Sequence, residues 1–184
     1  LTTEASIEDP AQPRHLAGGR ARGEIRFNDV SFRYAGADAD VLQHIDFTAR
    51  PGETTAFIGS TGSGKSSLIN LIPRFYDVTG GSITLDGVDI RQLSQKELRD
   101  NIGYVPQKGL LFSGTIASNL RYGDERASAD DLEQAAGIAQ AKEFIDQKPD
   151  GFDEPISQGG TNVSGGQKQR LSIARTLVKK APVY

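Results

Sequence analysis

The sequence predicts an α/β fold, in which strands and helices alternate along the chain. Three observations support this fold class. Apolar and polar residues alternate from Glu24 onward, a glycine-rich loop lies between a short apolar segment and a helical pattern, and an amphipathic helical pattern covers 165–180. The 184 residues suit one domain with a sizeable core.

The composition excludes several kinds of protein. No apolar run approaches the roughly 18 residues that cross a bilayer, and the absence of cysteine excludes disulfides and thiolate metal sites. The net charge of −3 argues against a primary role with nucleic acid, so no nucleic-acid partner is expected. The sequence begins with Leu1 and has no methionine, so we expect it to have been cut from a longer protein.

Residues 1–23 contain prolines and glycines but few large apolar residues. This composition is typical of a linker or a poorly ordered tail. The first half of the remaining chain is expected to contain strands at 24–34, 45–48 and 54–58, a helix at 66–72 that ends before Pro73, and a hairpin with strands at 82–85 and 88–90. Asp86 and Gly87 supply the hairpin turn.

The second half is expected to be mainly helical. The patterns predict helices at 95–101, 129–140, 142–147 and 165–180, a strand at 102–105 and a loop at 149–160. In the last helix Leu171, Ala174, Leu177 and Val178 share one face, which indicates packing against a core.

One loop matches the G-x4-G-K-[ST] pattern, with a predicted strand before it and a helix after it. A bland alternative is a glycine/serine turn with a solvated lysine. Backbone N–H groups of such a loop can surround phosphates because glycine allows close approach, so the pattern predicts nucleotide binding. The predicted binding residues here are Gly59, Ser60, Thr61, Gly62, Ser63, Gly64, Lys65, Ser66 and Ser67. Lys65 would reach the β- and γ-phosphates, and the Ser66 hydroxyl would be a ligand of Mg²⁺.

A second motif, from Val163 to Gln167, opens the last predicted helix. Considered alone, Ser164 is a good helix N-cap and Gly165 suits a tight entry into the helix. Because a phosphate loop lies upstream, a second interpretation is a nucleotide-binding role for Ser164, Gly165, Gly166 and Gln167.

With both motifs present, the sequence resembles the ATP-binding cassette transporter family over nearly its whole length. The family signature is usually Leu-Ser-Gly-Gly-Gln, and here Val163 replaces the leucine. The resemblance implies a P-loop NTPase core with a mixed or parallel sheet, an N-terminal antiparallel β subdomain and an α-helical signature subdomain at about 108–165. It also implies that 24–184 is an incomplete nucleotide-binding domain and that 1–23 is a linker from a membrane domain.

The resemblance assigns roles to two further residues. Tyr34 matches an aromatic residue that stacks on adenine, and Gln107 matches a glutamine that meets Mg²⁺ and whose loop contacts the membrane domain. Lys65 and Gln107 are therefore the catalytic candidates, and Ser66 and Gln107 the metal ligands. The segments 111–119 and 158–164 resemble exporter cassettes, whereas 154–158 lacks an acidic contact run that many exporters have.

The resemblance further implies ATP and Mg²⁺ as cofactors, with two cassettes meeting head to tail, as a homo- or heterodimer. Each ATP would lie between one phosphate loop and the other cassette's signature. The partners would be that second cassette and the transmembrane domain of the same transporter, at the cytoplasmic face of the cell membrane.

Hydrolysis in this family also needs an aspartate and a water-positioning carboxylate after the signature helix. No Asp or Glu follows Glu154, and the histidines His15 and His44 lie far from the expected switch position. The 184-residue chain is therefore expected to bind ATP without turning it over. Alternatives are a cassette with a soluble role in DNA repair or translation, an importer cassette, and a nucleotide-binding fragment without turnover.

Overall fold

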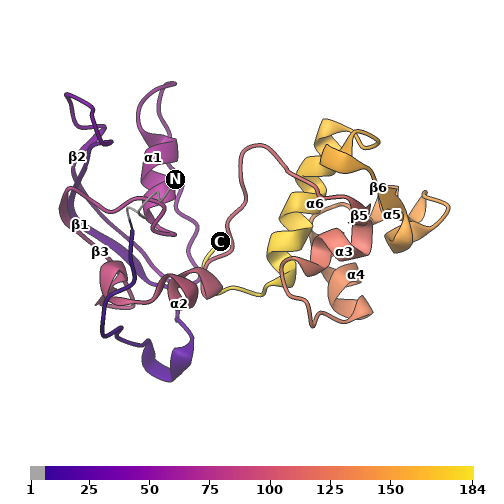
Figure 1. The fold of residues 1–184 in the computed structure, drawn as a ribbon, viewed down its shortest axis with the longest axis horizontal. Coiled ribbons are helices and arrows are strands. Elements are labelled where there is room, and N and C mark those ends of the chain that lie inside the picture. The colour runs from indigo at the N-terminus through magenta and orange to yellow at the C-terminus, as the bar shows by residue number, and fades with distance from the viewer. Residues whose placement is uncertain (1–6) are drawn as a thin grey trace, which may run out of the picture. The chain divides into compact units, whose positions relative to one another are not determined.

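The computed structural model describes residues 7–184, and these divide into two compact units. The first unit comprises the described residues up to Ile102 together with Val183, and the second comprises 103–182 with Tyr184. Figure 1 traces the elements of each unit by label and colour.

The first unit combines a sheet with two short α-helices. Its elements are β1 (Ile25–Phe32), β2 (Leu42–Ala49), α1 (Lys65–Leu71), β3 (Gly80–Leu85), β4 (Val88–Asp89) and α2 (Gln95–Asp100), with 3₁₀ turns at Ala17–Gly19 and Ile90–Gln92. The helices predicted at 66–72 and 95–101 are confirmed within one residue at each end.

The sheet is antiparallel throughout, with the strand order β2-β1-β3-β4. Alternate residues of β1, including Ile25 and Phe27, are buried, which is the pattern of a strand with one face on a core. The predicted hairpin is confirmed: Asp86 and Gly87 join β3 to β4 with φ angles of 49° and 80°. Both angles are left-handed, as a type I′ turn requires.

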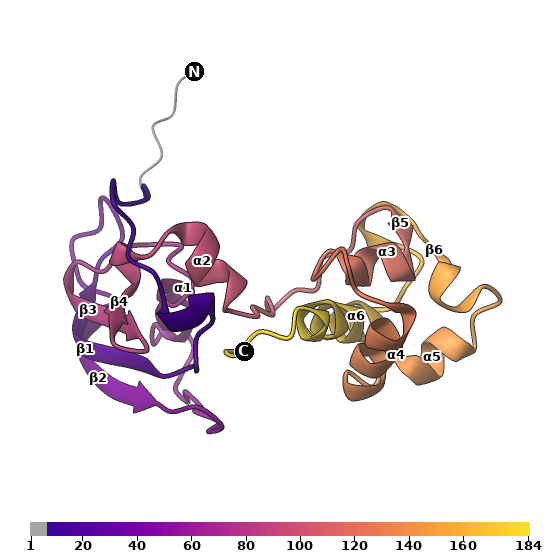
Figure 2. The same cartoon turned by 90° about the horizontal axis from the view of Figure 1, so that it is seen from below.

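One core joins the sheet to both helices. Leu68 and Leu71 of α1 and Leu98 of α2 belong to the same buried cluster as Phe27 and Ile83 of the sheet. The views of Figures 1 and 2 agree that α1 and α2 lie beside the same face of the sheet. Burial of these side chains is the main source of stability in this unit.

The segment before β1 is attached to the first unit along its length, so the expectation of a poorly ordered tail is wrong for 7–23. Residues 1–6 lie outside the described residues. The backbone N–H of Leu16 donates to a Glu97 carboxylate oxygen at 2.8 Å, and that of Ala21 donates to Asn101 Oδ1 at 2.8 Å. The amides of residues 22, 23 and 24 all donate to the Asp86 carboxylate. Composition could not show this attachment, because the acceptors lie more than sixty residues away in sequence.

Two predicted strands are absent from the part of the chain that the structure describes. Residues 53–60 form no strand, and Ile58 is 95% exposed. Residues 102–105 contribute only a parallel bridge between Ile102 and Val183. A strand needs a neighbour for its backbone groups, and apolar character alone does not supply one.

The second unit is mainly helical. Its elements are β5 (Gly114–Thr115), α3 (Ile116–Arg121), α4 (Ala129–Ile138), α5 (Lys142–Asp146), β6 (Pro155–Ile156) and α6 (Gly165–Val178), with 3₁₀ turns at Gly151–Asp153 and Gln158–Gly160. The predicted helices at 129–140, 142–147 and 165–180 are confirmed, each slightly shorter than expected.

Helix α6 is the centre of this second core, and it contacts both α3 and α4 (Figure 1). Leu171, Ala174 and Val178 are buried in one cluster with Ile116 and Leu132, as the helical periodicity predicted. Helix α3 was not predicted. Its capping box between Thr115 and Ser118 uses Ser at a position where Glu or Gln is the usual sign of a helix start.

Among residues 7–184, no helix is both long enough and apolar enough to span a membrane.

Candidate nucleotide-binding site

The phosphate loop occupies residues 59–66 and leads directly into α1. Gly62 and Gly64 have φ angles of 84° and 87°, in the left-handed region that glycine favours. A Cβ on Gly64 would lie 2.9 Å from Leu42 Cδ2 and 3.1 Å from the Val41 carbonyl oxygen. Both the conformation and the close approach to β2 therefore require glycine at position 64.

Lys65 is the first residue of α1, and its side chain turns back over the loop. The Lys65 ammonium donates to the carbonyl oxygens of Gly59 at 2.8 Å and Ser60 at 2.7 Å, and to Ser63 Oγ at 3.2 Å. The loop thus curves around a single positive charge. The ammonium is thus held at the loop, where it could bind a phosphate chain.

The two serines after Lys65 differ in exposure. Ser66 is exposed, as a hydroxyl that coordinates a metal ion must be, whereas Ser67 is buried. The Ser67 Oγ lies 2.8 Å from the hydroxyl of Tyr34. This bond joins the candidate stacking residue to the first turn of α1, and no pattern in the sequence pointed to it.

Tyr34 also belongs to a small aromatic cluster. Its ring meets Phe32 edge to face at 4.7 Å and Tyr76 at 5.1 Å. Tyr76 is 41% exposed. The cluster holds the Tyr34 ring near the phosphate loop, on the same unit, at a place where a base could stack.

Gln107 lies in the second unit, in an irregular and exposed segment. The other metal candidate, Ser66, lies in the first unit. Among residues 7–184, no group of three or more His, Asp, Glu or Cys side chains could hold a metal ion. An isolated hydroxyl suits Mg²⁺ only where phosphate oxygens and water supply the remaining ligands, which is how Mg²⁺ is usually bound with nucleotides.

The second motif forms the start of α6. Ser164 Oγ accepts from the Gln167 amide at 3.2 Å, and Gln167 Oε1 accepts from the Ser164 amide at 3.0 Å. The expected N-cap is confirmed, and the reciprocal bond from Gln167 completes a capping box. The S-x-x-Q spacing is the sequence signal for this box, and Gln167 was predicted only as a binding residue.

Among the residues that the structure describes, none requires glycine at positions 165 and 166. A Cβ on either residue would meet no heavy atom within 4 Å. Glycine weakens a helix by roughly 0.5–1 kcal/mol relative to alanine. Two glycines in the exposed first turn of α6 therefore leave the backbone open to something outside the described residues.

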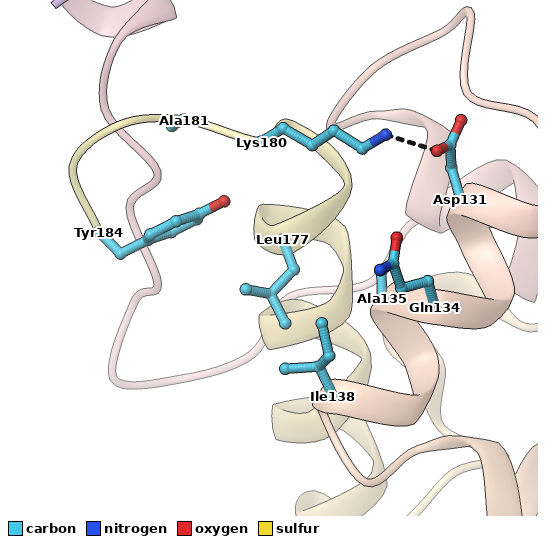
Figure 3. Close-up of a pocket in the computed structure, with 8 residues that line it drawn as sticks. All are labelled: Asp131, Gln134, Ala135, Ile138, Leu177, Lys180, Ala181 and Tyr184. Atoms are coloured by element: carbon cyan, nitrogen blue, oxygen red, sulfur yellow. Dashed lines mark hydrogen bonds and ion pairs between the residues drawn. The ribbon is translucent and has the colours of Figure 1, made fainter. Parts of the chain in front are cut away.

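A separate hollow of about 360 Å³ lies between α4, α6 and the end of the chain (Figure 3). Its rim carries an ion pair between Lys180 and Asp131, with Nζ and Oδ1 2.6 Å apart. The hydrogen bond from Lys180 lowers the pKa of Asp131 to about 2, with help from Ser128. No residue of either motif lines this hollow, so it is not the candidate nucleotide site.

Each of the two histidines contacts a carboxylate. His44 Nδ1 lies 2.7 Å from Asp29, whose hydrogen bond raises the pKa of the imidazole, and His15 Nδ1 lies 2.8 Å from Glu97. Both histidines and both carboxylates belong to the first unit.

Comparison with known proteins identifies similar sequences. Residues 42–184 match the family model described as ABC transporter. The chain is 46% identical over its whole length to an uncharacterized ABC transporter ATP-binding protein of Mycobacterium bovis, and covers 32% of that protein. It is 45% identical, over 98% of its length, to the ATP-dependent lipid A-core flippase of Albidiferax ferrireducens, and covers 31% of it.

Among solved structures, the chain is similar to a bacterial Atm1-family ABC exporter with ATP bound. The TM-score is 0.90 at 37% sequence identity, and the match covers 97% of this chain and 31% of the exporter. The chain thus spans about a third of the length of the relatives that it matches.

Proposed function

Since this chain belongs to the ATP-binding cassette transporter family and is similar to its exporters, we propose that it binds ATP at the phosphate loop and powers export. The observation that carries the proposal is the loop at 59–66, with its left-handed glycines and the Lys65 ammonium in its curve.

The roles of the site residues follow from their chemistry. Lys65 and the loop amides bind the β- and γ-phosphates, the Ser66 hydroxyl is a ligand of Mg²⁺, and Tyr34 offers a π-face to the base. Gln107 would be a second ligand of the metal. When bound, Mg²⁺ would neutralise charge that develops on the phosphates.

The signature acts on a second cassette. The exposed start of α6 presents N–H groups and the Ser164 hydroxyl, and a helix N-terminus favours an anion. The open first turn at Gly165 and Gly166 supports the approach of a nucleotide held by a partner cassette. ATP would then favour the head-to-tail dimer, and this difference in affinity could drive the membrane domain between two states.

The organisation of the whole transporter is part of the proposal. Residues 1–23 would connect a membrane domain to the cassette at 24–184, and about 108–165 would be its helical subdomain. The nucleotide-binding core would contain a mixed or parallel sheet, and the parallel bridge between Ile102 and Val183 supports a sheet of that kind. The cassette would lie at the cytoplasmic face of the membrane.

The substitution Lys65→Ala tests nucleotide binding. It removes the cation that faces the loop, and hydrogen bonds to charged groups contribute about 1.5–3 kcal/mol. We expect ATP affinity to fall roughly 10- to 100-fold, measured by titration of the intact protein with nucleotide. Lys96→Ala, an exposed lysine of α2 paired with Asp100, makes the same change in charge and serves as the control. Equal affinity in the two variants would contradict the proposed function.

A further inference from the structure

Arg175 lies on α6, on the turn of the helix that faces the segment after Gln107. It is partly buried, and among residues 7–184 no carboxylate pairs with it. Burial lowers the pKa of its guanidinium. A cation that is partly removed from water without a counterion needs other partners, and these partners show what Arg175 does.

The guanidinium is held by carbonyl-type oxygens on two different segments. Nη1 donates to the Leu110 carbonyl at 2.9 Å, Nε donates to the Asn119 carbonyl at 2.9 Å, and Nη2 donates to Asn119 Oδ1 at 2.8 Å. One side chain of α6 therefore binds both α3 and the irregular segment at 110–112.

Asn119 extends this contact. It is fully buried, and its side-chain amide donates to the carbonyl oxygens of Phe112 at 2.8 Å and Thr115 at 3.0 Å. Its Oδ1 also accepts from the Phe112 amide at 2.9 Å. Arg175 thus holds the segment directly at Leu110 and indirectly, through Asn119, at Phe112.

The flat face of the guanidinium meets two aromatic rings. The Arg175 Cζ lies 5.2 Å from the centroid of Phe112 and 5.9 Å from that of Tyr122, and the two rings are 4.7 Å apart. Both rings are exposed, by 48% and 63%. A cation over an aromatic face is stabilising, so the guanidinium helps to fix rings that have little other cover.

The backbone packs closely on α6 at both ends of this contact. A Cβ on Gly109 would lie 2.7 Å from the Lys168 carbonyl oxygen, and one on Gly123 would lie 2.0 Å from the Arg175 carbonyl oxygen. The chain touches α6 at Gly109 and Gly123, and Arg175 binds the part between them. This close packing gives the segment little room to move independently of the helix.

We propose that Arg175 is a positioning residue that joins the segment after Gln107, together with Tyr122, to the helix that begins at the signature. Residues 109–112 and α6 then move as one body. The functional consequence rests on the proposed function. If ATP displaces Ser164, the segment beside Gln107 would be displaced together with α6.

Arginine is required for this role because of its geometry. Its planar fork can donate to Leu110 and Asn119 at once while its face stacks on Phe112, whereas a lysine ammonium offers a single point of attachment. Arg175→Lys keeps the charge and removes the fork. Arg170, on the same helix, stacks over Phe144 at 5.6 Å and supplies the control variant Arg170→Lys.

The experiment uses a spin label at Leu110→Cys in the full-length protein, with any cysteine outside this chain replaced. This chain contains no cysteine of its own, and Leu110 is 66% exposed. We expect Arg175→Lys to increase the mobility of the label, and Arg170→Lys to leave it unchanged. Equal mobility in the two variants overturns the inference.

A second arm adds ATP with Mg²⁺ and separates the two proposals. We expect ATP to change the label spectrum in the parent and in Arg170→Lys, and to have a weaker effect in Arg175→Lys at unchanged ATP affinity. If Lys65→Ala leaves ATP affinity unchanged, the proposed function fails. If ATP binds normally and Arg175→Lys responds like the control, only the present inference fails.

A measurement on the unsubstituted protein covers the case in which Arg175→Lys does not fold. The Phe112 amide lies outside any helix or strand, yet it is bound by Asn119. We expect it to exchange with solvent as slowly as the interior amides of α6. Exchange at the rate of an open loop would overturn the inference.

Discussion

Gly64 has two separate reasons to be glycine, its left-handed backbone and its contact with β2. Gly62 has only the first reason, since a Cβ there would meet no atom within 4 Å. Substituting each glycine by alanine therefore distinguishes the cost of backbone strain alone, at Gly62, from that of strain plus a steric clash, at Gly64.

We expect Gly64→Ala to lower the free energy of unfolding more than Gly62→Ala does. A left-handed non-glycine residue costs about 1–2 kcal/mol, and position 64 adds the displacement of Leu42 or Val41. The measurement is urea unfolding of the two variants beside the parent. Equal losses would show that the loop moves away from β2 without cost.

Ser164 combines a structural and a proposed functional role at the start of one element. Its hydroxyl caps α6, so Ser164→Ala should destabilise the helix by about 1 kcal/mol whatever it binds. Ser164→Asp keeps a good cap and adds a negative charge where a phosphate is proposed to lie.

We expect Ser164→Asp to preserve the thermal stability of the intact protein and its affinity for ATP, and to prevent ATP-driven association of cassettes. Stability is followed by thermal unfolding, and association by cross-linking with and without ATP. Normal association in the aspartate variant would contradict the role of the signature, and Ser164→Thr serves as the neutral control.

The ion pair between Asp131 of α4 and Lys180, two residues after the end of α6, gives the second unit a pH dependence. The folded-state pKa of Asp131, about 2, lies below its ordinary value of about 3.9. The contribution of the pair is therefore present above that ordinary value and is lost as the pH falls toward 2.

We expect Asp131→Asn to lower the melting temperature at neutral pH, and the difference from the parent to disappear near pH 2. Asp130→Asn makes the same change in charge one residue earlier in α4 and should have a smaller effect. A difference that persists unchanged at pH 2 would show that Asp131 acts through something other than its charge.

Local patterns predicted the elements that depend on local contacts. Helix α6 was predicted because its buried face repeats every three to four residues, and the β3–β4 hairpin because Asp86 and Gly87 fit its turn. The loop at 59–66 was found because its chemistry is carried by consecutive residues.

Features that depend on distant partners could not be predicted in this way. The apolar segment at 54–58 has no neighbouring strand among the described residues, and an apolar pattern does not show whether one exists. The bond between Tyr34 and Ser67 and the contacts of Arg175 with Leu110 join residues far apart in sequence. Only the folded chain shows them.

At the scale of the whole 184-residue chain, the sequence contains the groups proposed to bind ATP, and no Asp or Glu follows Glu154 within it. Phosphoryl transfer depends on positioning and on charge near the phosphates, and groups that supply them matter by orders of magnitude. We therefore expect the 184-residue chain to bind ATP and to release phosphate at the background rate. Turnover well above that of its Lys65→Ala variant would show that other residues supply the chemistry.

The segment before β1 determines how the first unit responds to a force applied at the N-terminal end of that segment. A glycine-rich linker would behave as a coil, and its slack would absorb a displacement of several ångströms before any force passed through it. Here the amides of Leu16 and Ala21 are bound at α2, and the next three at Asp86. A displacement applied at Ile7 would therefore be transmitted to α2 and to the β3–β4 turn, because the segment is hydrogen-bonded to both.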